Sequence, residues 1–314
     1  MARLTHFMDS APLSNTFTFQ TNLHSYQIKW GSLGASHLPP LVFVHGTPWS
    51  SRVWAPFAVT LSRHFHVYLF DNPGFGESPL GTPLPEKADA ITEAVALDAN
   101  LAEQTKVFAA LYKTWENDGN EGWAGRKAHV IAHDHAGLMT LRASLLHGCE
   151  YASLCLIDVV AMPTAELPLF KLVAEQRSTF EQLPATTFRC IVEGYIRDAA
   201  HHALSPETMK VLIEPWLSDG GQKGFIRQLC QANSRSTDGL DSRYGEVGAK
   251  LPVKVIWGQQ DGWVPVETAT ALGKAVNAAE VTVIEDAGHL IMYDQGEALG
   301  TELGWWLSKV SGKP

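Results

Sequence analysis

The chain contains 314 residues, of which 45% are hydrophobic and 18% are charged. That length and apolar content suffice for one large domain with an inserted segment and a sizeable core. The formal net charge is −9. This excess of acidic groups disfavours nucleic acid and anionic membrane surfaces as partners, because both carry negative charge.

Cysteine usage and the lack of long apolar runs indicate an intracellular protein. The four cysteines show neither a CxxC pair nor another spacing typical of metal ligands, so we expect reduced, buried thiols. They are Cys149, Cys155, Cys190 and Cys230. The chain begins without a charged-then-apolar leader, and no apolar run approaches the roughly 18 residues that a membrane span needs. We therefore expect a cytoplasmic protein without membrane contacts. The sequence does not define its oligomeric state.

Apolar or alternating runs in the first half of the chain predict four strands. They are Thr16–Gln20, Tyr26–Trp30, Leu41–Val44 and His66–Phe70. The wholly apolar character of Leu41–Val44 is typical of a strand buried on both faces of a parallel sheet. A long helix is expected over Glu93–Trp115.

The second half of the chain continues this alternation on both sides of a strand-free segment. The predicted strands are Ser153–Ile157, Val253–Trp257 and Val281–Ile284, and helices are expected at Val266–Ala275 and from Gln295. Between them, residues 160–247 contain helical pieces broken by prolines. The pattern predicts an α/β fold with a core formed by residues 1–159 and 248–314 and a helical lid formed by residues 160–247.

The stretch from His129 to Gly137 carries the clearest local signal. An apolar run ends in Ala132, Asp134 follows two positions later, and Ala136 comes two positions beyond it. This small-x-nucleophile-x-small arrangement is typical of a nucleophile elbow, a sharp turn between a strand and a helix. Small residues are needed there because the turn is strained and the helix crosses close behind the strand. The usual occupant of the turn is serine, but here it is Asp134.

Five motifs occur in an order that resembles the α/β-hydrolases with a helical lid, over nearly the whole chain. They are HGTP (45–48), DNPGFGES (71–78), AHDHAG (132–137), WGQQD (257–261) and AGH (287–289). The resemblance implies an α/β-hydrolase fold with a mostly parallel eight-stranded sheet, helices on both faces and a helical lid. Within that superfamily, an aspartate at the elbow resembles the epoxide hydrolases, the haloalkane dehalogenases and the fluoroacetate dehalogenases.

An aspartate nucleophile suits attack at a saturated carbon. A carboxylate is ionised at pH 7 and needs no base to activate it, so Asp134 would displace a halide or open a strained C–O bond and become an ester. Water must then attack that ester, and the resemblance implies that His289 is the base. Charge on the Asp134 oxygen would be held by the main-chain N–H groups of Thr47 and His135. Such a donor is typically worth about 3 kcal/mol.

His289 also needs a carboxylate that orients its ring and stabilises the imidazolium. Asp261 follows the strand after the lid, at the commonest position in the superfamily. Asp158 follows the strand after the elbow and resembles the site that fluoroacetate dehalogenases use. We favour Asp261 and keep Asp158 as the alternative acid.

The resemblance leaves the reaction open. Epoxide opening needs an acid for the leaving alkoxide, a role that the family gives to lid tyrosines, and Tyr195 lies in the predicted lid. Haloalkane dehalogenases carry tryptophan after the nucleophile and often asparagine in the HGxP loop, where this chain has His135 and Thr47. Trp49 and Trp216 are candidates for a halide donor or a pocket wall.

We therefore expect a hydrolase that acts through a covalent ester on Asp134 and opens an epoxide. A haloalkane or haloacid dehalogenase, other hydrolytic or lyase chemistry on the same scaffold, and a non-catalytic ligand-binding member are the alternatives. The apolar content of the lid suggests a small apolar organic substrate, with water as the second reactant. We expect neither a metal nor another cofactor.

Overall fold

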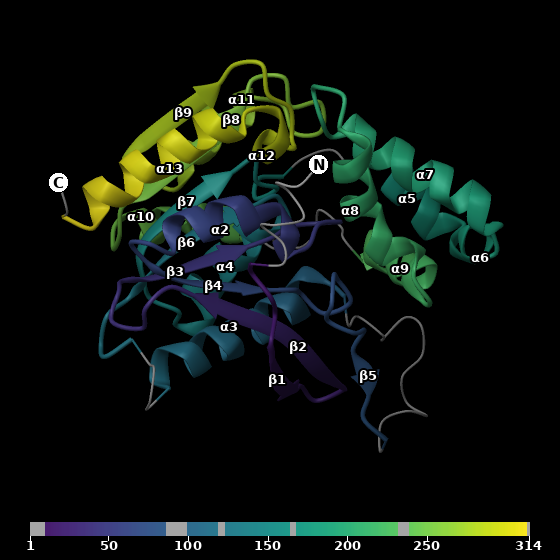
Figure 1. Cartoon of the computed structure of the whole chain (residues 1–314), viewed down its shortest axis with the longest axis horizontal. Helices are drawn as coiled ribbons and strands as arrows, with labels where there is room; N and C mark the ends of the chain where they lie inside the picture. Colours follow the sequence, from purple (N-terminus) through teal and green to yellow (C-terminus); the bar gives the residue numbers. More distant parts are fainter. Residues whose placement is uncertain (1–9, 86–98, 119–122, 164–167, 232–238, 313–314) are drawn as a thin grey trace.

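The computed structural model describes residues 10–85, 99–118, 123–163, 168–231 and 239–312. A twisted sheet lies at its centre, with helices around it and a separate group of helices at one end (Figure 1). The first part of the helix expected over 93–115 lies outside the described residues, and the described part is helical from Leu101, with Asn100 as its N-cap.

The described strands form one nine-stranded sheet. Eight of them follow the order β1-β2-β4-β3-β6-β7-β8-β9, and the ninth, β5, lies off this path and pairs with β2. Pairs along β4-β3-β6-β7-β8-β9 are parallel, whereas β2 is antiparallel to its neighbours. The strands are β1 (Asn15–Gln20), β2 (His24–Leu33), β3 (Pro40–Val44), β4 (His66–Phe70), β5 (Thr82–Pro83), β6 (Ala128–His133), β7 (Tyr151–Ile157), β8 (Val253–Gly258) and β9 (Glu280–Ile284). The predicted α/β-hydrolase fold is thus confirmed. The extra strand β5 has only two residues, too few to show a period in the sequence.

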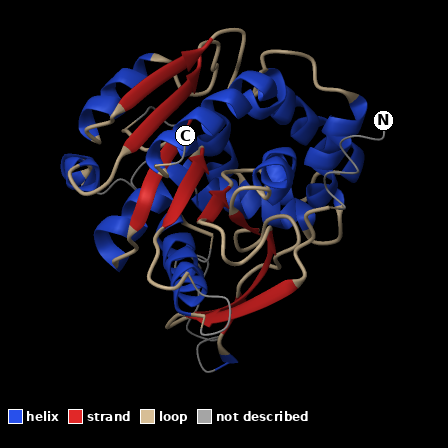
Figure 2. Ribbon diagram, turned by 60° about the vertical axis from the view of Figure 1, so that its left-hand side comes forward, coloured by secondary structure: helices blue, strands red, loops and turns tan. Residues whose placement is uncertain are grey.

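Helices lie on both sides of the strands (Figure 2). They are α2 (Ala55–Leu61), α3 (Leu101–Asn117), α4 (His135–His147), α5 (Pro168–Glu175), α6 (Arg177–Glu181), α7 (Ala185–Asp198), α8 (Pro206–Leu217), α9 (Gly221–Gln231), α10 (Gly245–Gly248), α11 (Glu267–Ala275), α12 (Ile291–Asp294) and α13 (Gly296–Val310). Short 3₁₀ turns occur at Ser51–Trp54 and Leu240–Arg243. Among the described helices, none combines the length and the apolar character that a bilayer crossing would need.

Side chains that alternate along the central strands divide between two cores, one on each face of the sheet. Val42 and Val44 of β3 pack in one core with residues of α3, α4 and α11. Leu41 and Phe43 of the same strand pack in the other core with residues of α2 and α13. Burial on both faces explains why this strand is wholly apolar.

The described part of residues 160–247 is helical and contains no strand. Helices α5 to α9, which we call the inserted helices, lie together beyond the carboxyl ends of the central strands (Figure 1). Their apolar residues, such as Phe188, Ile213 and Phe225, extend the core that α2 and α13 share. The inserted helices are therefore held by hydrophobic packing close to the edge of the sheet where its loops gather.

Gly137 offers a test of the packing between α4 and the sheet. A Cβ added at Gly137 would lie 2.4 Å from Cβ of Val159, whereas one added at Gly194 in α7 would meet nothing within 4 Å. We expect Gly137→Ala to lower the free energy of unfolding by about 1–3 kcal/mol through overpacking. The matched Gly194→Ala should raise it by up to about 1 kcal/mol through helix propensity. Denaturant unfolding of both variants measures the difference, and equal stabilities would contradict the close approach at Gly137.

Candidate active site

Asp134 lies at the sharp turn between β6 and α4, with φ 57° and ψ −130°. Glycines make this turn possible. A Cβ at Gly46 would lie 2.3 Å from Oδ1 of Asp134, and one at Gly137 would collide with Val159. Close contacts thus explain the glycine after the elbow and the glycine of the HGTP loop that faces it, and the turn presents the Asp134 carboxylate at the carboxyl end of the sheet.

His289 joins two of the predicted carboxylates. Its Nδ1 lies 2.9 Å from Oδ2 of Asp261, and its Nε2 lies 3.2 Å from Oδ2 of Asp134. All three residues are buried. Their exposed fractions are 0% for His289, 8% for Asp261 and 2% for Asp134. Three loops that are far apart in the sequence therefore place these groups in one hydrogen-bonded row.

Main-chain N–H groups hold the second oxygen of Asp261. Oδ1 accepts hydrogen bonds from the N–H groups of Trp263, at 2.8 Å, and Val264, at 2.9 Å. With Oδ2 bonded to His289, the carboxylate has partners on both oxygens. The orientation of the His289 ring is therefore set by a carboxylate that is itself fixed to the backbone.

Asp158 lies near this row but makes different contacts. Its Oδ1 accepts a hydrogen bond from the N–H of Gly258 at 2.7 Å, and its Oδ2 has no partner among the described residues. Burial raises the pKa of Asp158 well above its ordinary value, and the charge of Asp261 adds to this effect. Of the two predicted acids, the structure places Asp261 on Nδ1 of His289, whereas Asp158 is a buried carboxyl whose neutral form burial favours.

The two predicted main-chain donors are placed differently. The N–H of Thr47 donates to Oδ1 of Asp134 at 2.6 Å. His135 begins α4, and its ring Nδ1 lies 3.6 Å from the same oxygen. Thr47 therefore already contacts the carboxylate, while His135 adds a nearby imidazole and the amino end of a helix.

The charges of this row stabilise one another. Burial alone would lower the pKa of His289, but the carboxylates of Asp261 and Asp134 on its two nitrogens hold that pKa well above its ordinary value. Burial would raise the pKa of Asp134, yet His135 and the hydrogen bond from His289 hold it well below its ordinary range. These interactions thus favour the imidazolium form of His289 and the ionised form of Asp134.

Two neutral histidines support the loops around the row. Nε2 of His133 lies 2.8 Å from the carbonyl oxygen of His289, and burial lowers the pKa of His133 to about 3. His45 Nδ1 donates to the carbonyl of Gly46 at 2.9 Å, and its Nε2 accepts from the N–H of Asn72. A neutral imidazole can donate at one nitrogen and accept at the other, so both rings act as braces.

Aromatic rings stand beside the row. The ring of Trp263 lies 4.9 Å from that of His289 between centroids. It stacks on Trp49 at 6.0 Å and contacts the tilted ring of Tyr195 at 4.5 Å. Tyr195 belongs to α7 and so comes from the inserted helices. Sequence reasoning did not single out Trp263, although its place two residues after Asp261 could have drawn attention to it.

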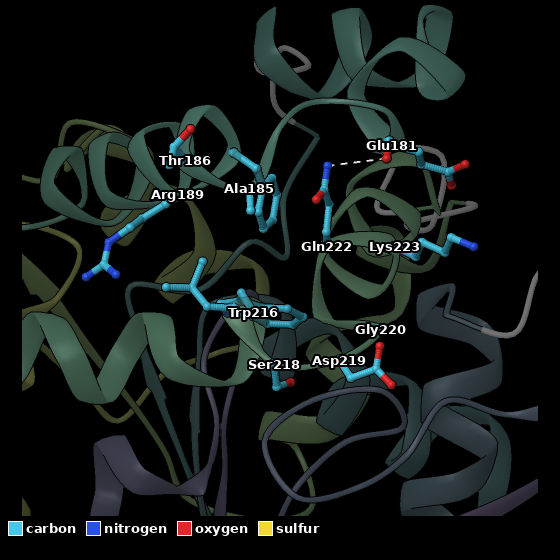
Figure 3. Close-up of a pocket in the computed structure, with 12 residues that line it drawn as sticks. Glu181, Ala185, Thr186, Arg189, Trp216, Ser218, Asp219, Gly220, Gln222 and Lys223 are labelled. Atoms are coloured by element: carbon cyan, nitrogen blue, oxygen red, sulfur yellow. Dashed lines mark hydrogen bonds between the residues drawn. The ribbon is translucent and has the colours of Figure 1, made fainter.

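Trp216, the third predicted pocket residue, faces a different space. Its ring lines a surface pocket of about 540 Å³ among α6 to α9, close to Phe188 and Gln222 (Figure 3). Its indole N–H donates to the carbonyl of Pro48 at 3.0 Å. Trp216 therefore ties the inserted helices to the loop that carries Thr47, and its N–H is already used.

Within the described residues, one group of imidazoles and carboxylates has metal-ligand spacing, and it lies outside this row, at His201, His202 and Asp286.

Comparisons with known proteins agree with this fold. A model of the alpha/beta hydrolase family matches residues 41–300, and the chain belongs to that family. An alpha/beta hydrolase fold protein from Burkholderia ambifaria is 33% identical, with a TM-score of 0.78 over 93% of this chain and 97% of that one. The pimeloyl-[acyl-carrier protein] methyl ester esterase of Aeromonas salmonicida is 24% identical over 255 residues, 80% of this chain and 88% of that protein. The haloalkane dehalogenase DbeA of Bradyrhizobium elkani shares the fold at 16% identity, with a TM-score of 0.68 over 95% of this chain and 99% of that one.

The pKa of His289 can show which carboxyl group, that of Asp261 or that of Asp158, orients its ring. Because the charge of Asp261 raises this pKa, Asp261→Asn should lower it. Burial favours the neutral form of Asp158, so Asp158→Asn should change the pKa of His289 much less. Titration of the imidazole resonances by nuclear magnetic resonance checks both variants. The opposite ranking would assign the orienting role to Asp158.

Proposed function

We propose that this protein is a hydrolase that acts through a covalent ester on Asp134 and opens epoxides of apolar organic molecules. The observation that carries the proposal is an ionised carboxylate at the elbow, where serine is usual, held between the Thr47 N–H and His289. A carboxylate in that place can attack a saturated carbon without a base, which a serine cannot do.

In the first step, Oδ2 of Asp134 attacks an epoxide carbon while Oδ1 stays bonded to the Thr47 N–H. A C–O bond forms on the enzyme, the ring C–O bond breaks, and the leaving oxygen needs a proton. Tyr195 is the proposed acid. Burial raises the pKa of its hydroxyl well above the ordinary value, and the charge of Asp134 adds to this effect, so the hydroxyl stays protonated until the alkoxide forms.

In the second step, water attacks the ester carbonyl and His289 accepts its proton. Ester formation neutralises Asp134, which removes one of the two charges that raise the pKa of His289. The imidazolium therefore gives up its proton more easily once the ester exists, and the Tyr195 phenolate left by the first step is the proposed acceptor. The base form of His289 increases as the pH rises through the pKa of this state. Asp261 then stabilises the imidazolium, and the Thr47 N–H stabilises the tetrahedral oxyanion on Oδ1, with the His135 N–H as its proposed second donor. Collapse of this intermediate breaks the ester C–O bond, and the departing alkoxide takes the proton of the new carboxylic acid to give the diol. Asp134 is then again a carboxylate beside the protonated His289, as at the start of the cycle.

The inserted helices supply the apolar side of this site, and we propose that they act as its lid. The ring of Tyr195 packs on Phe170 at 6.3 Å and on Phe225 at 5.8 Å, both from the inserted helices, as well as on Trp263. Such an aromatic enclosure favours an apolar substrate and excludes bulk water, which strengthens the charge interactions in the row.

A haloalkane dehalogenase is the second candidate, and one observation favours it. Nε1 of Trp49 is buried and has no hydrogen-bond partner among the described residues. An unpaired indole N–H beside the site is a suitable weak donor for a leaving halide. Trp216 is the weaker candidate for this role, because its N–H already bonds to Pro48.

His289→Gln tests the covalent route. The variant should still undergo alkylation of Asp134 but lack the base for hydrolysis, so the ester should accumulate. Mass spectrometry after mixing with styrene oxide or 1-bromohexane should show the mass of an intact adduct on the peptide that contains Asp134. Asp134→Ala should form no adduct, and His64→Gln, at an exposed histidine, should turn over like the unmodified protein.

Two results would refute the ester. One is normal turnover by His289→Gln. The other is a single turnover in ¹⁸O water that labels the product and not the protein, since attack by Asp134 must leave the water oxygen on the enzyme.

Tyr195→Phe and Trp49→Phe separate the two candidate reactions. Tyr195→Phe keeps the ring on Trp263 but removes the proposed acid, so epoxide opening should fall by about 10²- to 10⁴-fold. Trp49→Phe should affect epoxide opening less and should weaken reaction with 1-bromohexane if its N–H holds the halide. Steady-state rates of both variants with both substrates measure this. An epoxide rate unaffected by Tyr195→Phe would eliminate Tyr195 as the acid.

A further inference from the structure

Two exposed histidines and an aspartate meet where the inserted helices adjoin the loop that carries His289. His201 and His202 follow the end of α7, and Asp286 lies between β9 and His289. Their potential ligand atoms all lie within 4.8 Å of one another. The side chains are 37%, 50% and 59% exposed respectively, so an ion from solution can reach them.

The spacing of these atoms matches a metal site. Nε2 of His201 lies 3.4 Å from Oδ1 of Asp286, and Nε2 of His202 lies 3.0 Å from its Oδ2. Zinc bonds of about 2.0–2.2 Å to imidazole nitrogen and carboxylate oxygen place tetrahedral ligand atoms about 3.4 Å apart. Two imidazoles and one carboxylate also form a donor set that borderline divalent ions prefer, with a fourth position left for water.

The backbone around these side chains is fixed by hydrogen bonds before any ion binds. The carboxylate of Asp294 accepts from the N–H groups of His201, His202 and Gly288, each at 2.9 Å. The two loops approach so closely that a Cβ at Gly288 would lie 2.8 Å from the nitrogen of His201. Both histidine side chains therefore project from a stretch of backbone that hydrogen bonds already hold. This reduces the conformational entropy that would be lost when an ion binds.

The carboxylate is oriented as well. Asp286 has a φ of 61°, a conformation uncommon for a residue with a side chain. Its Oδ2 accepts a hydrogen bond from Nε2 of Gln295 at 3.2 Å. Partners of this kind hold metal-binding carboxylates in place, and they tune the affinity for the ion.

We infer that His201, His202 and Asp286 form a binding site for a divalent transition-metal ion, with zinc as the best fit. The site goes beyond the proposed hydrolysis and is separate from the row of Asp134, His289 and Asp261. A bound ion would link the end of α7 to the 286–290 loop, where the N–H of Leu290 already donates to the carbonyl of Ala199 at 3.0 Å. It would therefore fasten the inserted helices to the loop that carries His289.

Calorimetric titration of the metal-free protein with zinc chloride tests the site. We expect saturable binding of one ion per chain, weakened at least about tenfold by His201→Ala, His202→Ala or Asp286→Asn. Zinc at 100 times its dissociation constant should shift the unfolding equilibrium about 100-fold, or about 2.7 kcal/mol, in the unmodified protein. Zinc should also slow hydrogen exchange of the Leu290 amide in the unmodified protein but not in the Asp286→Asn variant.

Matched variants control for binding elsewhere. His64→Ala removes another exposed histidine, and Cys190→Ser removes an exposed thiol, and both should bind zinc as the unmodified protein does. Thermal unfolding without zinc shows whether each variant is folded. The inference fails if the folded protein binds no zinc at one equivalent, or if all three ligand variants bind it unchanged. No substrate is used, so this result is independent of the ester chemistry.

Discussion

The structure of the site depends on one buried imidazole with a carboxylate on each ring nitrogen. Neither charge of Asp134 or Asp261 could stay in this interior unpaired, because burying an isolated carboxylate costs several kcal/mol. The two ring nitrogens of His289 contact both carboxylates. The N–H groups of Thr47, Trp263 and Val264 donate hydrogen bonds to their remaining oxygens. The same balance that permits burial also sets the protonation states that the proposed chemistry begins from.

This charge balance exists because parallel strands end at the same edge of a sheet. Loops after β3, β6, β8 and β9 supply all of the groups in the row, although they are separated by up to 242 residues, from Thr47 to His289. The inserted helices approach the same edge. Hydrogen bonds from Trp216 to Pro48, from Trp263 to Asp198 and from Leu290 to Ala199 hold them there. The inferred metal site lies on the last of these connections.

Local patterns predicted well those features that depend on neighbours in the chain. The apolar run Leu41–Val44 indicated a doubly buried strand, and the small residues around Asp134 indicated a tight turn, because each pattern reflects a contact that the local backbone geometry imposes. Patterns were weak where an element was short or where a contact depended on packing. The two-residue strand β5 is too short to show a period, and the contact between the rings of Trp263 and His289 depends on two loops that meet in the fold.

The fold class, the sharp turn at Asp134 and the side chains that meet at the edge of the sheet could therefore be predicted from the sequence, since motif order and spacing specify them along the chain. The choice between Asp261 and Asp158 as the partner of His289 could not, because both follow parallel strands and both reach the same edge. Only the folded structure separates them. Two main-chain N–H groups of the loop after β8 and one imidazole nitrogen of the loop after β9 contact Asp261. Asp158 receives one N–H, and its second oxygen has no hydrogen-bond partner among the described residues.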